Sequence, residues 1–210
     1  MLKFAAPGLS TLTVVLMAIA ASAHAQNTPP PQANVAGTTV TECTGNLAPG
    51  NYDAVDVPAG ATCTINNGTV NVTTGGVTVG SGATFYVAGA PTSMLTLTSG
   101  SLDSTNAYAI EVNSAHIHGN ANLMGTSGGA AIFTNSFVGG TLSVQNSSSV
   151  SQIIVDSNTV GNSLIDQNNQ GTNSVIGNII AVNLVCSGNQ PPPDVQGNTV
   201  AGNSTDQCLR

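Results

Sequence analysis

The chain has 210 residues, of which nine are Asp or Glu and only two are Lys or Arg, so its formal net charge is −7 at pH 7. So few cations cannot neutralise phosphates, which argues strongly against nucleic acid and anionic membranes as partners. Lys, Arg and Glu are also strong helix formers, whereas the abundant Gly, Asn, Ser, Thr, Val and Ile favour short strands joined by turns.

Residues 1–25 are predicted to be a signal peptide. Lys3 is followed by an apolar run over residues 12–21 and by the cleavage pattern Ala-His-Ala at 23–25. A membrane anchor is the alternative, but it needs about 20 apolar residues. We therefore expect an exported protein, extracellular, at the cell surface or in the periplasm, with no membrane insertion once the signal is removed.

Residues 26–42, which contain "TPPPQ", are predicted to be a lead-in segment with an N-terminal cap, and residues 43–210 a single domain. Within that domain a step of about 22 residues aligns apolar positions, as stacked turns would. The aligned columns are Val72, Met94, His116, Val138, Val160 and Val182; Ile65, Val87, Ala109, Ala131, Ile153 and Val175; Ile110, Ile132, Ile154 and Ile176; and Leu142, Leu164, Cys186 and Cys208.

The columns predict an all-β solenoid of about seven coils, because short strands with one apolar face bury it by winding and stacking. Equivalent residues would lie about 4.8 Å apart. Asn side chains are therefore expected to hydrogen-bond in ladders, with Asn113 beside Asn135 and Asn146 beside Asn168. The separation of the two "NTV" copies at Asn158 and Asn198 is not a multiple of the step, so the loop "NQPPPD" is expected to shift the register.

The four cysteines are predicted to form two disulfides, as is usual in exported chains. Cys186 and Cys208 share a column, and Cys43 and Cys63 are separated by nearly one turn. One coil of separation brings Cα atoms within the roughly 4.4–6.8 Å that a disulfide needs. The expected pairs, Cys43–Cys63 and Cys186–Cys208, would hold the two ends of the solenoid.

The coil periodicity, the Asn-rich turns and the ending "CSGNQPPPDVQGNTVAGNSTDQC" resemble secreted bacterial right-handed parallel β-helix proteins, over roughly residues 44–208. This is the architecture of pectate lyases and autotransporter passengers, and the chain is similar to small bacterial members with one short solenoid. The resemblance implies a right-handed parallel β-helix. It does not by itself imply an activity.

An enzyme acting on polysaccharide, glycoside hydrolase-like or a degenerate relative of one, is the alternative function. Lyases of the resembled architecture use Arg or Lys as base, and after signal removal only Arg210 remains. A hydrolase needs two carboxylates about 5–9.5 Å apart. Asp156 and Asp166 are the candidates, with Glu111 as a third, but we expect Asp156 and Asp166 to be solvated turn acids instead.

The "HIH" stretch is the candidate metal site, because His116 and His118 share one face of a strand, with Glu111 as a third ligand. The period, however, places His116 in the column of Met94 and Val138. We therefore predict an inward-pointing, structural His116 and no metal or cofactor. Calcium in the turns is left open, because Asp and Asn oxygens suit it.

These patterns favour a non-enzymatic exported module, adhesin-like or structural, that displays Asn, Ser and Thr to an extracellular polysaccharide or surface glycan. Sugars also stack on aromatic side chains, and the candidates for a platform are Phe85, Tyr86, Phe133 and Phe137, with Phe133 expected to face outward. Exposed strand edges at the solenoid ends predict self-association.

Overall fold

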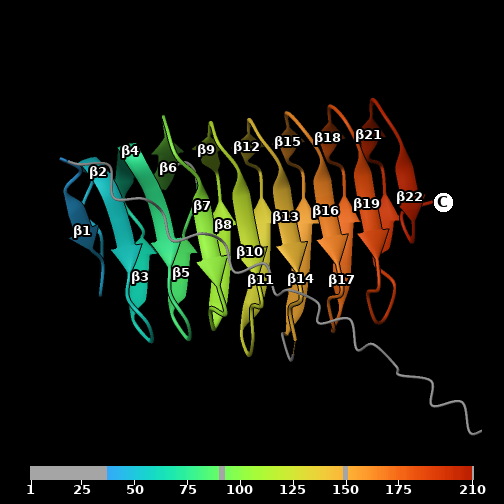
Figure 1. Cartoon of the computed structure of the whole chain (residues 1–210), viewed down its shortest axis with the longest axis horizontal. Helices are drawn as coiled ribbons and strands as arrows, with labels where there is room; N and C mark the ends of the chain where they lie inside the picture. Colours follow the sequence, from blue (N-terminus) through green and yellow to red (C-terminus); the bar gives the residue numbers. More distant parts are fainter. Residues whose placement is uncertain (1–36, 90–92, 149–150, 210) are drawn as a thin grey trace, which may run out of the picture. The chain divides into compact units, whose positions relative to one another are not determined.

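The computed structural model describes residues 37–89, 93–148 and 151–209, and these residues belong to one compact unit. The described part is all β-structure without a helix, wound into a parallel β-solenoid of about seven turns (Figure 1). The predicted signal peptide and most of the lead-in lie outside the described residues. Within the described ranges no helix is long and apolar enough to cross a membrane.

Each full turn contributes three strands, so the solenoid has three rows of parallel strands. The first row is a seven-stranded sheet: β3 (Thr62–Ile65), β5 (Thr84–Val87), β8 (Ala109–Asn113), β11 (Ala130–Thr134), β14 (Gln152–Asp156), β17 (Asn173–Ile176) and β20 (Asp194–Gln196). The second row is β6 (Ser93–Leu97), β9 (Ala115–Ile117), β12 (Phe137–Val138), β15 (Thr159–Val160), β18 (Ile179–Ile180) and β21 (Thr199–Val200). The third row is β7 (Leu102–Thr105), β10 (Ala121–Met124), β13 (Leu142–Gln145), β16 (Leu164–Gln167), β19 (Leu184–Ser187) and β22 (Ser204–Asp206).

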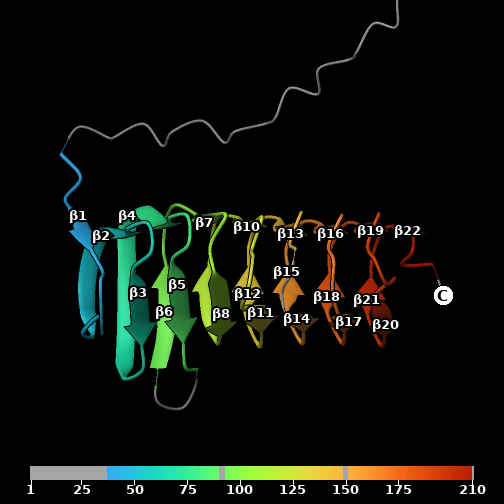
Figure 2. The ribbon, with the colours of Figure 1, turned by 90° about the horizontal axis from the view of Figure 1, so that it is seen from below.

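The N-terminal end joins the second and third rows into one sheet. β4 (Gly68–Val79) pairs with β6 through its first half and with β7 through its second half. On its other side it pairs with β2 (Gly50–Val57), which in turn pairs with β1 (Val40–Glu42). Figure 2 shows β1 and β2 at one end of the stack and β20 to β22 at the other.

The length of a turn varies, so the fixed step expected from sequence is wrong for much of the chain. Ala131 lies beside Ile153, as that step requires. Thr84, however, lies beside Ala109, which is a longer step, and Ser174 lies beside Asp194, which is a shorter one. Only the strands must stay in register, and the corners between them absorb extra residues, so a strict repeat is not needed.

The "NQPPPD" segment does not shift the register, contrary to the expectation from the "NTV" copies. Thr159 pairs with Ile179, and Ile179 pairs with Thr199, so the two successive steps are equal in length. The separation of Asn158 and Asn198 is therefore two regular turns. The repeated letters mark the same corner in successive coils.

Two corners of each turn explain why Asn and Gly recur. From β8 onward, the residue that follows each first-row strand has positive φ, as in Asn135 (51°), Ser157 (60°) and Gly177 (66°). The corner after the third-row strand is the same, with Asn146 (56°), Asn168 (54°) and Gly188 (68°). The left-handed region is open to Gly and tolerated by Asn, which selects these residue types at both corners.

The next residue at each corner points inward, and in the later turns it is an Asn, buried except for the half-buried Asn198 of the last turn. Asn158, Asn178 and Asn198 form the first amide column, and Asn169 and Asn189 the second. The backbone N–H of Asn158 donates to Oδ1 of Asn178 (2.9 Å), and that of Asn178 donates to Oδ1 of Asn198 (2.8 Å). Each amide Nδ2 donates to a carbonyl inside the solenoid, as Asn178 does to Val155 (2.7 Å).

These columns are not the ladders expected from sequence. Nδ2 of Asn135 does donate to Oδ1 of Asn113 (3.1 Å), so that predicted pair is hydrogen-bonded. Asn146 and Asn168 occupy equivalent corner positions, where the backbone of Asn146 donates to Gln167 (2.9 Å). The columns satisfy backbone groups that burial would otherwise leave without partners.

Both predicted disulfides are present. Cys43 and Cys63 have Cα atoms 5.4 Å apart, and those of Cys186 and Cys208 are 5.2 Å apart. Cys186 is in register with Asp206 rather than with Cys208, so the second bridge reaches past its pairing position. The two bonds hold the first and last turns, where a solenoid lacks one neighbour. Disulfides are typical of proteins in oxidising compartments.

Candidate functional site

Asp166 lies inside the solenoid and cannot reach a substrate. Its side chain is fully buried, in the inward column between Val144 and Cys186. Three amides donate to the carboxylate: Nδ2 of Asn169 (2.7 Å), Asn173 (2.8 Å) and Asn189 (2.9 Å). Burial raises the pKa of Asp166 to about 6, although these three hydrogen bonds act to lower it.

Asp156 and Glu111 do not complete a carboxylate pair with Asp166. Asp156 ends β14, half-buried, and accepts hydrogen bonds from the Ser174 hydroxyl (3.1 Å) and the Ile176 backbone N–H (3.0 Å). Glu111 lies on the outer side of β8, in register with Ile132. Asp166 is therefore in the core, and the other two acids are on the first-row sheet, where β11 lies between their strands.

Sequence reasoning missed a closer pair of acids. Glu42 of β1 is in register with Asp56 of β2, at the N-terminal end of the third row. Burial, and then the neighbouring Glu42 carboxylate, raise the pKa of Asp56. A shortened first turn separates the two acids, so the regular step does not connect them. The sequence signal is local: Glu42 in "VTE" and Asp56 in "AVDV" are charged residues within otherwise mostly apolar strand segments, which places each on the outer face of its strand.

His116 points outward, so the prediction of an inward, structural His116 is wrong. It is exposed on β9, between the buried Ala115 and Ile117, and it pairs with Phe137 of β12 rather than with Val138. His118 is exposed as well, and the two imidazole rings stack with centroids 5.0 Å apart. The apolar–polar–apolar alternation of "AHI" was the signal that the fixed period overrode.

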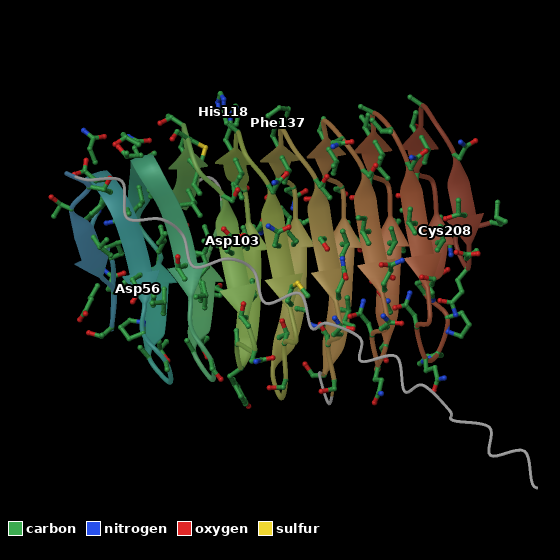
Figure 3. All side chains as sticks on the ribbon, viewed as in Figure 1. Asp56, Asp103, His118, Phe137 and Cys208 are labelled. Atoms are coloured by element: carbon green, nitrogen blue, oxygen red, sulfur yellow. A yellow bond between two sulfur atoms is a disulfide. The ribbon has the colours of Figure 1, made fainter. Side chains whose placement is uncertain are left out.

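One row of outward side chains runs along the second-row sheet, and we call it the outer row. It consists of Thr96, His116, Phe137, Thr159, Ile179 and Thr199. The Phe137 ring meets the His116 ring edge-on, with centroids 4.6 Å apart. Figure 3 shows His118 and Phe137 projecting from the same edge of the solenoid. Neighbouring members of the row are one strand spacing, about 4.8 Å, apart.

The four aromatic candidates do not form one platform. Phe85 and Phe133 are fully buried, so the expectation of an outward Phe133 is wrong. Tyr86 and Phe137 are each 38% exposed, but Tyr86 lies on β5 of the first row and Phe137 on β12 of the second. Phe133 aligns with Val112 and Val155, both buried, which the varying turn length concealed.

Among the described residues, no three His, Cys, Asp or Glu side chains gather as a metal cage would require. Glu111, proposed as a third ligand to the histidines, is in the first row and the histidines are in the second. The described part also has a shallow pocket of about 130 Å³ at its C-terminal end, lined by Leu184, Asn198, Val200, Ser204 and neighbouring residues. It is the open end of the last turn.

Comparison with protein-family models, with curated proteins and with solved structures found no match to this chain. The fold is therefore described by its geometry alone, as a parallel β-solenoid of about seven turns. The resemblance to pectate lyases and autotransporter passengers remains a prediction from the sequence.

Proposed function

We propose that the protein is a non-enzymatic, exported β-solenoid module that binds an extended extracellular polysaccharide or surface glycan along the outer row. The observation that carries the proposal is the exposure of this face. Phe137 (38%), Ile179 (57%) and the nearby Met94 (40%) are exposed large apolar residues, and all three lie on second-row strands. Exposed apolar side chains gathered on one face mark interaction surfaces.

The chemistry of the outer row suits a polymer of sugars. Thr159 and Thr199 are exposed hydroxyls on either side of Ile179, and the Phe137 ring offers an apolar surface. Each second-row strand contributes one residue to the outer row, so similar groups repeat along the solenoid axis. An extended polysaccharide lying along this axis would contact several of them in succession. The corner asparagines do not take part, because Asn158, Asn169, Asn178 and Asn189 are buried and hydrogen-bonded inside.

A panel of plant, bacterial and animal polysaccharides tests the proposal, with binding and release of reducing or unsaturated ends measured together, with and without Ca²⁺. We expect binding without cleavage, and Phe137→Ala should weaken it about fivefold or more, as loss of a central aromatic contact does. Tyr86→Ala is the matched control, because Tyr86 has the same exposure on a different row and should leave binding unchanged.

Equal losses for the two variants, or binding to none of the polysaccharides, would contradict the proposal. Cleavage would support the alternative, a carbohydrate-active enzyme. Mutagenesis would then begin at Glu42 and Asp56, the two acids in register on neighbouring strands, with Glu42→Gln and Asp56→Asn. Acids in register on neighbouring strands are the natural starting point, because retaining glycosidases hold their two carboxyl groups only about 5–5.5 Å apart.

A further inference from the structure

We propose that His116 and His118 form a two-imidazole chelate for a divalent first-row transition metal, with Cu²⁺ preferred. Both side chains are exposed on the same side of the chain at β9, and their rings lie 5.0 Å apart between centroids with planes 14° from parallel. Metal–imidazole bonds are about 2.0–2.1 Å long, so two ligating nitrogens need to approach to about 3 Å. To reach this separation, the two rings must turn about their χ angles out of the stacked arrangement, because imidazole lone pairs lie in the ring plane.

On the neighbouring turn, the residue beside His118 is a glycine and carries no side chain. Gly139 lies against the His118 backbone: its N–H donates to the Ile117 carbonyl (2.7 Å), and a Cβ there would come within 2.5 Å of the His118 oxygen. No side chain therefore covers His118 from that strand. Phe137 packs edge-on against His116 instead, which restricts where that ring can turn.

The other edge of the pair is lined by hydroxyls rather than by charges. Thr96 is in register with His116, and the His118 N–H donates to the Leu97 carbonyl (3.0 Å), which places Thr98 beside it. The protein thus provides two nitrogen ligands, and water fills the remaining positions. Such a nitrogen- and oxygen-ligated site favours Cu²⁺ and then Ni²⁺, following the general order of affinities for divalent metals.

Titration with CuCl₂, followed by calorimetry and by electron paramagnetic resonance, tests the chelate. The full chain is used without a histidine tag and carries His24→Ala, so that the one remaining imidazole outside the described residues cannot contribute. We expect one Cu²⁺ per chain with hyperfine coupling to two imidazole nitrogens. His116→Ala and His118→Ala should each weaken binding at least tenfold, because the second imidazole binds intramolecularly.

A matched variant tests whether tight binding requires two adjacent histidines, or only two exposed histidines anywhere on the same face. His118→Ala combined with Thr199→His keeps two exposed imidazoles on the outer row, but places them four strands apart, about 19 Å. It should bind Cu²⁺ as weakly as His118→Ala alone. Binding as tight as that of the parent, or coupling to a single nitrogen in the parent, would overturn the proposal.

Discussion

The early and late turns of the solenoid share the same two corners but fill them with different residues. After the positive-φ residue, the early turns place Ala107 and Ala115 inside, whereas the late turns place Asn169, Asn178 and their equivalents. Between them, Ser136 is intermediate: its hydroxyl accepts from the Ala115 N–H (2.9 Å), and its own N–H donates to Asn158 Oδ1 (3.1 Å).

The comparison shows that a corner N–H must be satisfied, but that the chemistry can vary. Where the amide columns run, the step between turns keeps one constant length. In the early turns it varies, from a shorter step between Leu102 and Ala121 to a much longer one between Thr84 and Ala109. Each corner Asn bonds to the corner Asn of the next turn, so the two must lie at the same height on neighbouring coils. With an Asn at both corners, the number of residues in each turn is fixed.

The largest expected effect is on apolar packing in the early turns. Phe85→Ala removes a fully buried ring from the core and should lower the free energy of unfolding by about 3–5 kcal/mol. Tyr86→Ala, on the adjacent and exposed position of the same strand, should cost under about 1 kcal/mol. Chemical denaturation measures both, and similar losses for the two would show that the early turns do not depend on their apolar core.

Removing either disulfide should cost about 2–4 kcal/mol, by the loss of its constraint on the unfolded chain. The bridged cysteines have sequence separations of 20 and 22, so this contribution is nearly equal at the two ends. Paired Cys→Ala variants followed by amide hydrogen exchange would locate the fraying. Fast exchange confined to the end that lost its bridge is expected, and uniform exchange along the solenoid would contradict an end-stapling role.

The amide columns should carry the late turns. Asn178→Ala removes the acceptor of the Asn158 N–H and the amide that donates to the Val155 carbonyl, and should lower the free energy of unfolding by about 2–3 kcal/mol. Asn203→Ala is the control, because Asn203 is exposed on a turn of the same region, and it should change stability by less than about 0.5 kcal/mol. Equal effects in denaturation would remove the distinction between early and late turns.

The smallest expected effect is the pH dependence from Asp166. Its pKa in the fold, about 6, is above its ordinary value of 3.8, so the folded state holds the proton more tightly. Its contribution to stability is thus fully present below about pH 3.8 and is lost as pH rises through 6, by about 1–3 kcal/mol. The difference between the parent and Asp166→Asn, measured across this pH range, isolates this group; a difference that stays constant would contradict the assignment.

The sequence by itself determined the kind of fold, the disulfide pairs and the stacking of turns. Composition excluded surface helices, and spaced apolar residues required a buried interior, so a solenoid of about seven turns was predictable. The cysteine pairing was predictable as well, because one turn of separation brings Cα atoms within disulfide reach, whatever the local register.

Only the tertiary structure decided which side chains face inward. Corners absorb extra residues while the strands stay in register, so a fixed period falls out of step with the strands. An error of one residue assigns a side chain to the wrong face, which misplaced His116 and Phe133 in opposite directions. The same is true of Asp166, whose polarity predicts exposure but which three amides hold inside. Asn169 lies in the corner after the same strand, but Asn173 and Asn189 come from the next strand and the next coil, and their positions depend on corner lengths that no single stretch of sequence specifies.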